Sequence, residues 1–479
     1  MSTKERFDLI VIGGGPAGVT ATLRARELGA SVALIERKRL GGTCTNDGCV
    51  PTRVLARAAR LARDARQIAD YGLVGAAPTV DLAAVMAQVQ AKIDLLHAKK
   101  DLLGTLDRSG VTTLSNAGPA HFVDAGSVEL GDGTRLTAEK FIICAGGYAR
   151  RLPFPGAELA YTHGDIWELR ELPRSLAIIG AAATGCQLAS IFNAFGSQVT
   201  LLEVAPRILA GEDADVSSEV SRAFAANGIR VATSVERITE LTRQGAGLRL
   251  AYERGGRELL DVDAVVLAVG WPGNVAGLGL EAAGVAVERG YITTDDYLRT
   301  SQPHIYAAGD INGKMMLVQS GGYEARVAAE NAVGGNRERV AHSIVPHGGF
   351  TDPEYGSVGP TEAEARKLGE VLVATAPMSV VDRAVIDGHP EGFCKLIVRR
   401  DDHTLVAAHV VGEQALEIVH VVAGGMVAGM RVEQLANLAI AYPTYTAVLG
   451  AAAQQLMREL GTVSTAQWRA LGQLATSPL

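Results

Sequence analysis

One pattern occurs twice in this chain, and it restricts the possible fold more than any other feature. In the first copy, an apolar run over residues 8–12 leads into Gly13-x-Gly15-x-x-Gly18, a helical stretch and a second apolar run that ends at Glu36. The second copy, shifted by 167 residues, has Gly180, Gly185, Gly196 and Glu203 at the positions of Gly13, Gly18, Gly29 and Glu36. Glycine-rich composition alone would not preserve this register, so we predict two strand–helix–strand units.

Each unit has the chemistry of a dinucleotide-binding site. The first glycine allows a tight turn, the second lets the backbone approach a pyrophosphate, and the third packs the helix against the strand. The terminal acid receives a ribose hydroxyl. In the second unit Ala182 replaces the middle glycine and is still small. Glu203 favours NADH over NADPH, although Arg207 keeps NADPH as an alternative, and a solvated strand end is the competing interpretation of Glu203.

Two of the five cysteines, Cys44 and Cys49, lie within a glycine-rich stretch that ends at Pro51. Side chains five residues apart on a regular helix point about 140° from each other, and a disulfide needs Cα atoms within about 7 Å. We therefore expect Cys44 in a loop and Cys49 in the first turn of a helix capped by Asn46 or Asp47. The helix dipole would stabilise a thiolate there. Two unrelated buried thiols are the alternative, but the position after a nucleotide unit favours a redox-active dithiol.

Composition sets the remaining limits. The 479 residues are 48% hydrophobic and 20% charged, with 55 glycines, which is typical of an α/β enzyme of about three domains. A formal charge of −7 argues against a nucleic-acid or anionic-membrane surface. No apolar run approaches the ~18 residues of a membrane span, and residues 1–7 lack the apolar core of a signal peptide. Because few cysteines occur in so long a chain, we expect a cytoplasmic protein whose closely spaced pair is catalytic.

The rest of the chain completes an α/β architecture. Helices are expected over residues 52–70, 83–105 and 317–333, and Cys144 is expected in a buried strand. An acid, Asp310, ends a strand in Ala307-Ala308-Gly309-Asp310. Residues 462–479 carry little signal beyond one possible short helix. We predict two Rossmann-like nucleotide-binding domains, the first at 1–155 and 273–344 and the second at 156–272, followed by a C-terminal α+β domain at 345–479.

The ordered set of motifs resembles the FAD-dependent pyridine nucleotide–disulfide oxidoreductases, which include dihydrolipoamide dehydrogenase, glutathione reductase and mercuric reductase. The resemblance covers residues 6–460, and residues 350–354 look like the start of that family's dimerisation domain. It implies a homodimeric enzyme. The FAD-binding domain, at 1–155 and 273–344, would hold FAD on the first fingerprint, the NAD(P)H-binding domain, at 156–272, would hold NAD(P)H on the second, and 345–479 would be the dimerisation domain. Electrons would pass from the flavin to the Cys44–Cys49 disulfide, with Cys49 facing the flavin and Cys44 attacking the substrate.

The resemblance also implies which residues contact the cofactors. Glu36 would bind the FAD ribose and Asp310 its ribitol. The remaining contacts expected for FAD or NAD(P)H are Gly13, Gly15, Gly18, Thr43, Arg53, Ala120, Gly146, Gly309, Met316, Gly180, Gly185, Gln187, Glu203, Val235 and Gly270. No resident metal site is expected.

The sequence departs from the family pattern at several chemically important positions. Arg53 replaces a lysine near the flavin, and Gln187 replaces the acid that pairs with it. Tyr442 and Ala447 replace a proton-shuttling His–Glu pair, and a tyrosine with a pKa near ~10 is a poor base at neutral pH. Tyrosine at this position is similar to mercuric reductase, but that enzyme's C-terminal cysteine pair is absent because no cysteine follows Cys394. Packing beside Pro443 is the alternative role for Tyr442.

These observations predict an NADH-dependent flavoprotein with catalytic residues Cys44, Cys49, Arg53 and Tyr442. Its acceptor would be one that does not need the usual histidine: a metal ion, a quinone or an atypical thiol adduct. One alternative is a dihydrolipoamide-type disulfide reductase that uses another base. A second is a flavoprotein partner or scaffold with incidental turnover, although binding alone needs neither the dithiol nor two fingerprints.

Overall fold

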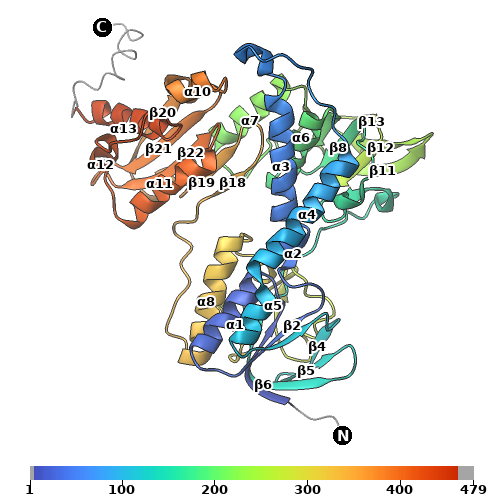
Figure 1. Ribbon diagram of the computed structural model, residues 1–479. Helices are drawn as coiled ribbons and strands as arrows, with labels where there is room; N and C mark the ends of the chain where they lie inside the picture. Colours follow the sequence, from blue (N-terminus) through green and yellow to red (C-terminus); the bar gives the residue numbers. More distant parts are fainter. Residues whose placement is uncertain (1–4, 462–479) are drawn as a thin grey trace. The chain divides into compact units, whose positions relative to one another are not determined.

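A computed structural model of the protein describes residues 5–461, and the described chain folds into two compact units (Figure 1). No helix within these limits is both long and apolar enough to span a membrane. The short helix expected within residues 462–479 lies outside the described residues. Within the described residues, the first unit comprises residues 5–180, 191–199 and 236–342, and the second comprises residues 181–190, 200–235 and 343–461.

A seven-stranded sheet forms the centre of the first unit. Its strands are β1 (Glu5–Ile12), β2 (Val32–Glu36), β3 (Thr112–Ser115), β4 (Ala120–Asp124), β5 (Ser127–Leu130), β6 (Arg135–Ile143) and β17 (Ile305–Ala307). The order is β3-β2-β1-β6-β5-β4, and β17 also pairs with β6. Strands β1, β2, β3, β6 and β17 run parallel, whereas β4 and β5 form an antiparallel extension.

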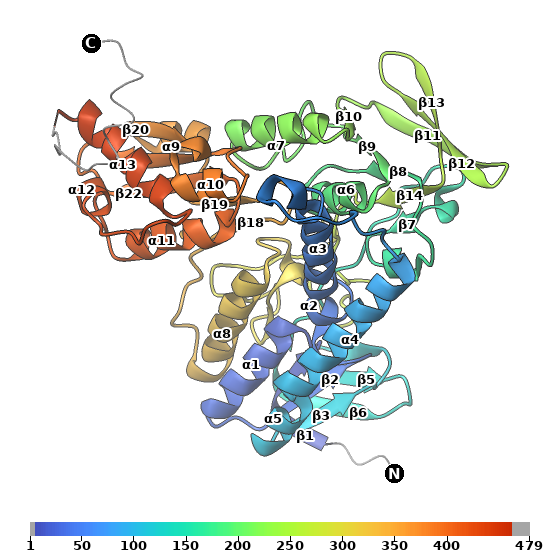
Figure 2. The same ribbon diagram turned by 45° about the horizontal axis from the view of Figure 1, so that its top comes forward.

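Both faces of this sheet are covered, which explains its continuous apolar runs. Successive side chains of β1 point to opposite faces. Leu9 and Val11 pack with alanines of α1 (Pro16–Glu27) and α8 (Val318–Gly334), two helices that lie side by side (Figure 2). Ile10 and Ile12 pack on the other face with Phe122 and Phe141, whose rings meet edge to face at 5.0 Å. Helix α8 confirms the helix predicted over residues 317–333.

Four helices between β2 and β3 carry the cysteine motif and its neighbours. They are α2 (Gly42–Asn46), α3 (Cys49–Asp64), α4 (Leu82–Lys100) and α5 (Leu102–Arg108), with a 3-10 turn, η1 (Ile68–Tyr71), after α3. Helices α2, α3 and α4 pack against one another. The helix predicted over 83–105 is interrupted at Asp101, whose φ of 40° is left-handed and ends α4 before α5 begins. The predicted continuous helix over 52–70 is likewise wrong, because α3 ends at Asp64.

The second strand–helix–strand repeat is divided between the two compact units. In the first compact unit, β8 (Ser175–Ile179) and β7 (Tyr161–Thr162) pair in parallel with β14 (Ala264–Leu267). The glycine-bearing helix α6 (Ala183–Phe195) and strand β9 (Gln198–Leu202) follow in the chain, and β9 pairs in parallel with β10 (Arg230–Ala232). Smaller elements are η2 (Ala157–Leu159), η3 (Ile166–Glu168), α7 (Ala214–Ala226), β11 (Arg237–Gln244), β12 (Gly247–Glu253), β13 (Arg257–Val262), β15 (Val287–Glu288), β16 (Tyr291–Ile292) and η4 (Asp310–Asn312).

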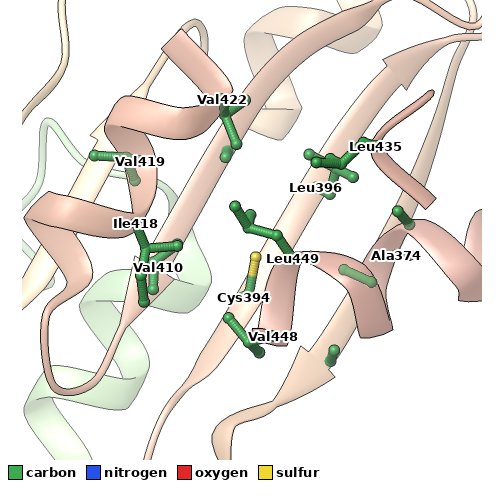
Figure 3. Close-up of a cluster of buried hydrophobic side chains, with 14 of the residues drawn as sticks. Ala374, Cys394, Leu396, Val410, Ile418, Val419, Val422, Leu435, Val448 and Leu449 are labelled. Carbon is green, nitrogen blue, oxygen red and sulfur yellow. The ribbon is translucent and has the colours of Figure 1, made fainter. Parts of the chain in front are cut away.

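An antiparallel sheet in the order β18-β19-β22-β21-β20 dominates the C-terminal part of the second unit. Helices α11 and α13 cover it, and Figure 3 shows Ile418 and Leu449 of these helices around Cys394 of β21. Cys394 is fully buried, so it belongs to the core. The elements are β18 (His347–Gly349), β19 (Tyr355–Val358), α9 (Glu362–Leu368), β20 (Val371–Pro377), η5 (Met378–Val380), α10 (Asp382–Ile386), β21 (Phe393–Arg399), β22 (Leu405–Val411), α11 (Ala415–Val427), α12 (Val432–Ala436) and α13 (Ala447–Glu459).

Candidate redox and nucleotide-binding site

The two cysteines of the motif lie on consecutive helical segments. Cys44 is in the middle of α2, and Cys49 is the first residue of α3. The expectation of a loop at Cys44 is wrong, because left-handed Gly41 (φ 97°) allows α2 to begin directly after it. The chain turns again at Gly48, and the two free thiols hydrogen-bond to each other. The placement of Cys49 and Pro51 in the first turn of a helix is confirmed.

The predicted capping roles of Asn46 and Asp47 are wrong, because Gly48 caps α3 and no side chain assists it. Asn46 Oδ1 instead lies 2.7 Å from His97 Nε2. The Asp47 carbonyl accepts a hydrogen bond of 3.1 Å from Trp167 Nε1. Both residues therefore join the turn between the cysteines to elements distant in sequence, and the first N–H groups of α3 are not taken by a side-chain cap.

Electrostatics divides the pair into one thiolate and one thiol. Hydrogen bonding by Cys44 lowers the pKa of Cys49 to about 7, outweighing the opposite effect of burial. The pKa of Cys44 is raised, first because it shares this hydrogen bond and second because it is partly buried. Lys100, the last residue of α4, lowers both pKa values by its charge and donates from Nζ to Thr45 Oγ1 at 3.0 Å. Lys100 belongs to no motif, so its role was not predictable from the sequence.

The first glycine fingerprint forms a close-packed turn. A Cβ atom on Gly18 would lie 1.7 Å from the Gly13 carbonyl oxygen, and one on Gly13 would lie 2.3 Å from the carbonyl oxygen of Cys144. Gly15 precedes α1 with no side-chain cap, and a Cβ there would meet nothing nearer than 3.7 Å. Cys144 directly follows β6 and is buried, as the core interpretation expects. The N-terminus of α1 can therefore receive an anionic pyrophosphate.

The terminal acids of the two copies are held in the same way. Glu36 accepts hydrogen bonds of 2.7 Å from the backbone N–H groups of Gly14 and Lys38. Glu203 accepts bonds of 2.6 and 2.8 Å from two N–H groups at the same register. The first glycine of each copy is left-handed, with φ of +106° and +100°. Because each carboxylate oxygen has a second lone pair, both acids can still accept a ribose hydroxyl.

Asp310 follows β17 and is held by a tryptophan that sequence analysis missed. Trp271 Nε1 donates to Asp310 Oδ2 at 2.9 Å, and the Trp271 ring lies 5.2 Å from the ring of His163. Burial raises the pKa of the Asp310 carboxyl. Its charge in turn raises the pKa values of Cys44 and Cys49, so Asp310 lies near the dithiol. The first unit thus brings the dithiol and this acid together.

An unpartnered polar atom supports a bound group in the first unit. Ser320, in the first turn of α8, is buried, and its Oγ has no hydrogen-bond partner within residues 5–461. A bound cofactor is expected to satisfy such an atom, so these residues fit FAD.

The other positions predicted for cofactor contact in this unit are Thr43 in α2, Arg53 exposed on α3, Ala120 buried at the start of β4, Gly146 at φ +66°, Gly270 at φ +120°, Gly309 at φ +80° and Met316 exposed before α8.

Glu203 belongs to the second unit together with Val235, whose buried N–H donates to the Glu203 carbonyl at 2.9 Å. Arg207 donates from its guanidinium to the carbonyls of Ala210 and Glu212 at 2.8 and 2.9 Å. Arg207, the residue that left NADPH as an alternative, is therefore hydrogen-bonded to the protein's own backbone. Gly185 lies in α6 as predicted.

Two of the departures from the family pattern have defined partners in the second unit. Gln187 Oε1 accepts a hydrogen bond of 3.1 Å from the Phe350 N–H. Tyr442 is 53% exposed, and its hydroxyl donates to Asp382 Oδ2 at 2.7 Å. Ala447 begins α13 and offers no polar group. Asp382 begins α10, far from Tyr442 in the chain, and was not predicted from the sequence.

The chain matches two family descriptions. Residues 7–325 match "Pyridine nucleotide-disulphide oxidoreductase", and residues 345–453 match the dimerisation domain of the same family. These matches confirm the predicted fold class, an α/β chain with Rossmann-like domains and a C-terminal dimerisation domain.

Similar proteins have several named activities. The chain is 31% identical to a mercuric reductase of Lysinibacillus sphaericus, covering 96% of this chain and 84% of the relative. It is also 31% identical to a dihydrolipoyl dehydrogenase of Chlorobaculum tepidum, covering 95% and 98%. Among solved structures, the Cu(II) complex of RclA, an HOCl-induced flavoprotein disulfide reductase of Escherichia coli, matches with a TM-score of 0.84 and 25% identity over 94% of this chain and 100% of that one.

Proposed function

The chain belongs to the pyridine nucleotide-disulphide oxidoreductase family, and from that premise we propose that it reduces a thiophilic metal ion, of the Cu(II) or Hg(II) class, at the expense of NADH. Members of this family use FAD and NAD(P)H. Bound FAD supplies hydride acceptance from the nicotinamide and electron transfer to a disulfide. The residues of this chain bind the cofactors and present the dithiol to the acceptor.

The dithiol is the single observation that carries this proposal. Cys49 has a pKa of about 7, so a large fraction is thiolate at neutral pH, and Cys44 holds the second sulfur beside it. Soft thiolates are the preferred ligands of thiophilic metal ions. Oxidation of one thiolate and one thiol to a disulfide releases two electrons and the Cys44 proton. Two electrons reduce either one Hg(II) or two Cu(II) ions, and neither product needs a proton.

The arrangement around Tyr442 fits an acceptor that needs no general acid–base group. A disulfide substrate leaves as thiolates that must be protonated, whereas a reduced metal ion does not. The Tyr442 hydroxyl donates its one hydrogen bond to Asp382, so toward a substrate its oxygen can only accept. The named activity of a mercuric reductase agrees with a metal ion as the acceptor, and RclA, a disulfide reductase by name, forms a Cu(II) complex.

The second candidate is a dihydrolipoamide-type disulfide reductase, because relatives of that name align over nearly their whole length. Such an enzyme would need a proton donor other than Tyr442. A quinone and an atypical thiol adduct also fit the absence of the His–Glu pair, and both belong in the same assay.

NADH is the proposed electron donor. Glu203 would repel a 2′-phosphate, and like charges at close range cost several kcal/mol. Arg207 is bound to backbone carbonyls and does not compensate. We also propose that the protein acts as a homodimer through its dimerisation domain, and that it works in the reducing cytoplasm, where a catalytic dithiol can be maintained.

The test is a turnover survey of the FAD-loaded enzyme with NADH. The acceptors are Cu(II), Hg(II), a benzoquinone, lipoamide and glutathione disulfide, each with wild type, Cys44→Ser and the double variant Tyr442→His, Ala447→Glu. We expect metal-dependent NADH oxidation that Cys44→Ser abolishes, slow disulfide reduction by wild type, and faster disulfide reduction by the double variant. Fast lipoamide turnover by wild type would refute the metal-ion proposal, and no turnover with any acceptor would favour a scaffold.

A further inference from the structure

A fully buried carboxylate in the first unit has no role in the proposed reaction. Glu324 of α8 has 0% relative exposure, yet it lies among backbone and side-chain donors. Its Oε2 accepts hydrogen bonds from the Gly309 N–H at 2.7 Å and from Asn312 Nδ2 at 2.8 Å. These two donors lie on either side of Asp310, so one carboxylate oxygen spans the turn that carries this acid.

The turn depends on these contacts because its backbone is unusual. Gly309 has a φ of +80°, and a Cβ there would lie 3.2 Å from the Ala17 Cβ, so the chain passes close to α1. A buried charge is tolerated only when its hydrogen bonds are made. Glu324 therefore fixes the Gly309–Asn312 turn in one conformation, and Trp271 holds the Asp310 side chain from outside the turn.

His342 supplies the opposite partner. Its Nε2 lies 2.8 Å from Glu324 Oε1, and because a carboxylate has only lone pairs, Nε2 must carry the proton and donate. The histidine side chain is 15% exposed and meets the Tyr323 ring edge to face. Both oxygens of Glu324 are thus engaged, one by the turn and one by the imidazole.

We propose that Glu324 is a positioning residue that sets Asp310 for FAD, with His342 as its hydrogen-bonding counterpart. The inference rests on the proposed assignment of Asp310 to the FAD ribitol. Loss of the Glu324 carboxylate leaves the Gly309 N–H and the Asn312 amide without their acceptor, and the turn relaxes away from the conformation that aims Asp310. The effect on FAD is therefore transmitted through Asp310.

A double-mutant cycle tests this transmission. The FAD dissociation constant is measured by flavin fluorescence on dilution of the holoenzyme, for wild type, Glu324→Ala, Asp310→Ala and the double variant. Each single variant is expected to weaken FAD binding by about tenfold or more, as for a lost hydrogen bond to a charged group. The double variant should be no weaker than Asp310→Ala by more than about threefold, because the two residues act in series. Arg326→Ala, which removes a half-exposed charge from the same helix, is the matched control and should leave the constant unchanged.

A conservative variant separates positioning from charge. Glu324→Gln keeps an oxygen for Gly309 and Asn312, and its amide can donate to the other tautomer of His342, so FAD affinity should stay within about threefold of wild type. Should Glu324→Ala not fold, Glu324→Asp takes its place in the cycle, since it keeps the charge but withdraws the acceptor by one methylene. Unchanged FAD affinity in the truncated or shortened variant, additive losses in the cycle, or a tenfold loss in Glu324→Gln would overturn the inference. Unchanged affinity in Asp310→Ala would refute the assignment of Asp310 itself, and metal reduction by that holoenzyme would still test the proposed function separately.

Discussion

The pKa of Cys49 leads to a prediction that depends on one atom of its partner. Hydrogen bonding by Cys44 is the largest influence that lowers the pKa of Cys49 to about 7. Cys44→Ala removes the donor, whereas Cys44→Ser replaces the thiol by a hydroxyl that can still donate. The pKa of Cys49 should therefore rise in the alanine variant and remain lowered in the serine variant. Because the shift in wild type is downward, thiolate predominates above pH 7 and is lost as the pH falls below it.

The size of the effect can be worked out. With a pKa of about 7, about half of Cys49 is thiolate at pH 7, and an ordinary pKa of ~8.5 would leave about 3%. The thiolate fraction thus falls ~16-fold in Cys44→Ala. A more basic thiolate is more nucleophilic, by ~5-fold for this rise in pKa, so alkylation at pH 7 slows only ~3-fold. The midpoint of the pH profile, which moves upward by ~1.5 units, is the more sensitive observable.

The assay is the rate of iodoacetamide alkylation of reduced enzyme between pH 5 and pH 10, quantified at Cys49 by peptide mass. Cys144, Cys186 and Cys394 do not compete, because burial raises the pKa of each. Lys100→Gln is the control for the nearby charge and should move the midpoint upward by less than Cys44→Ala does. Identical midpoints in wild type and Cys44→Ala would refute the argument and assign the thiolate to the helix N-terminus.

Three further outcomes are expected. Lys395→Met should lower the free energy of unfolding by about 3–5 kcal/mol, because this buried lysine binds three carboxylates at 2.5–2.9 Å and its loss strands them. Urea denaturation measures this, and Arg222→Met, which breaks an exposed pair on α7, should change it by less than about 1 kcal/mol. Glu203→Ala should raise kcat/KM for NADPH relative to NADH, and a wild type that prefers NADPH would contradict the role given to this acid. Gly18→Ala should yield protein without bound FAD, judged by its absorbance spectrum, because its Cβ would overlap the Gly13 carbonyl.

The features that sequence reasoning predicted are those that local backbone geometry demands. The two glycine turns require left-handed φ and close approach, so only glycine fits, and the pattern is visible without any tertiary information. The strands of the nucleotide units were predictable because burial on both faces leaves an unbroken apolar run. The break at Asp101 was not, because the apolar pattern continues through it and an aspartate tolerates a left-handed φ.

The partners of the site residues could not be predicted for a different reason. Trp271 and Glu324 act on the turn at Asp310 from 39 and 14 residues away, and neither belongs to a motif. Lys100 and Asp382 likewise meet the cysteine motif and Tyr442 only after folding. A motif identifies the group that touches a cofactor, whereas the groups that set its pKa or orientation are chosen by tertiary contact.

The two nucleotide units hold their terminal acids in the same way but differ in the segment that follows each of them, and only the first is followed by the redox cysteines. Both copies hold their terminal acid by the same pair of backbone N–H groups, so the repeat supplies the same binding geometry twice. The segments that follow differ. After the first copy, helix α3 begins with Cys49. After the second copy, Gly211 and Val216 occupy the positions equivalent to Cys44 and Cys49. There Asp213 caps α7 and binds Lys395, so the second copy uses this turn as a structural anchor. The redox chemistry therefore depends on one helix N-terminus and the groups around it, and the identity of the acceptor must be sought there and at Tyr442 rather than in the fingerprints.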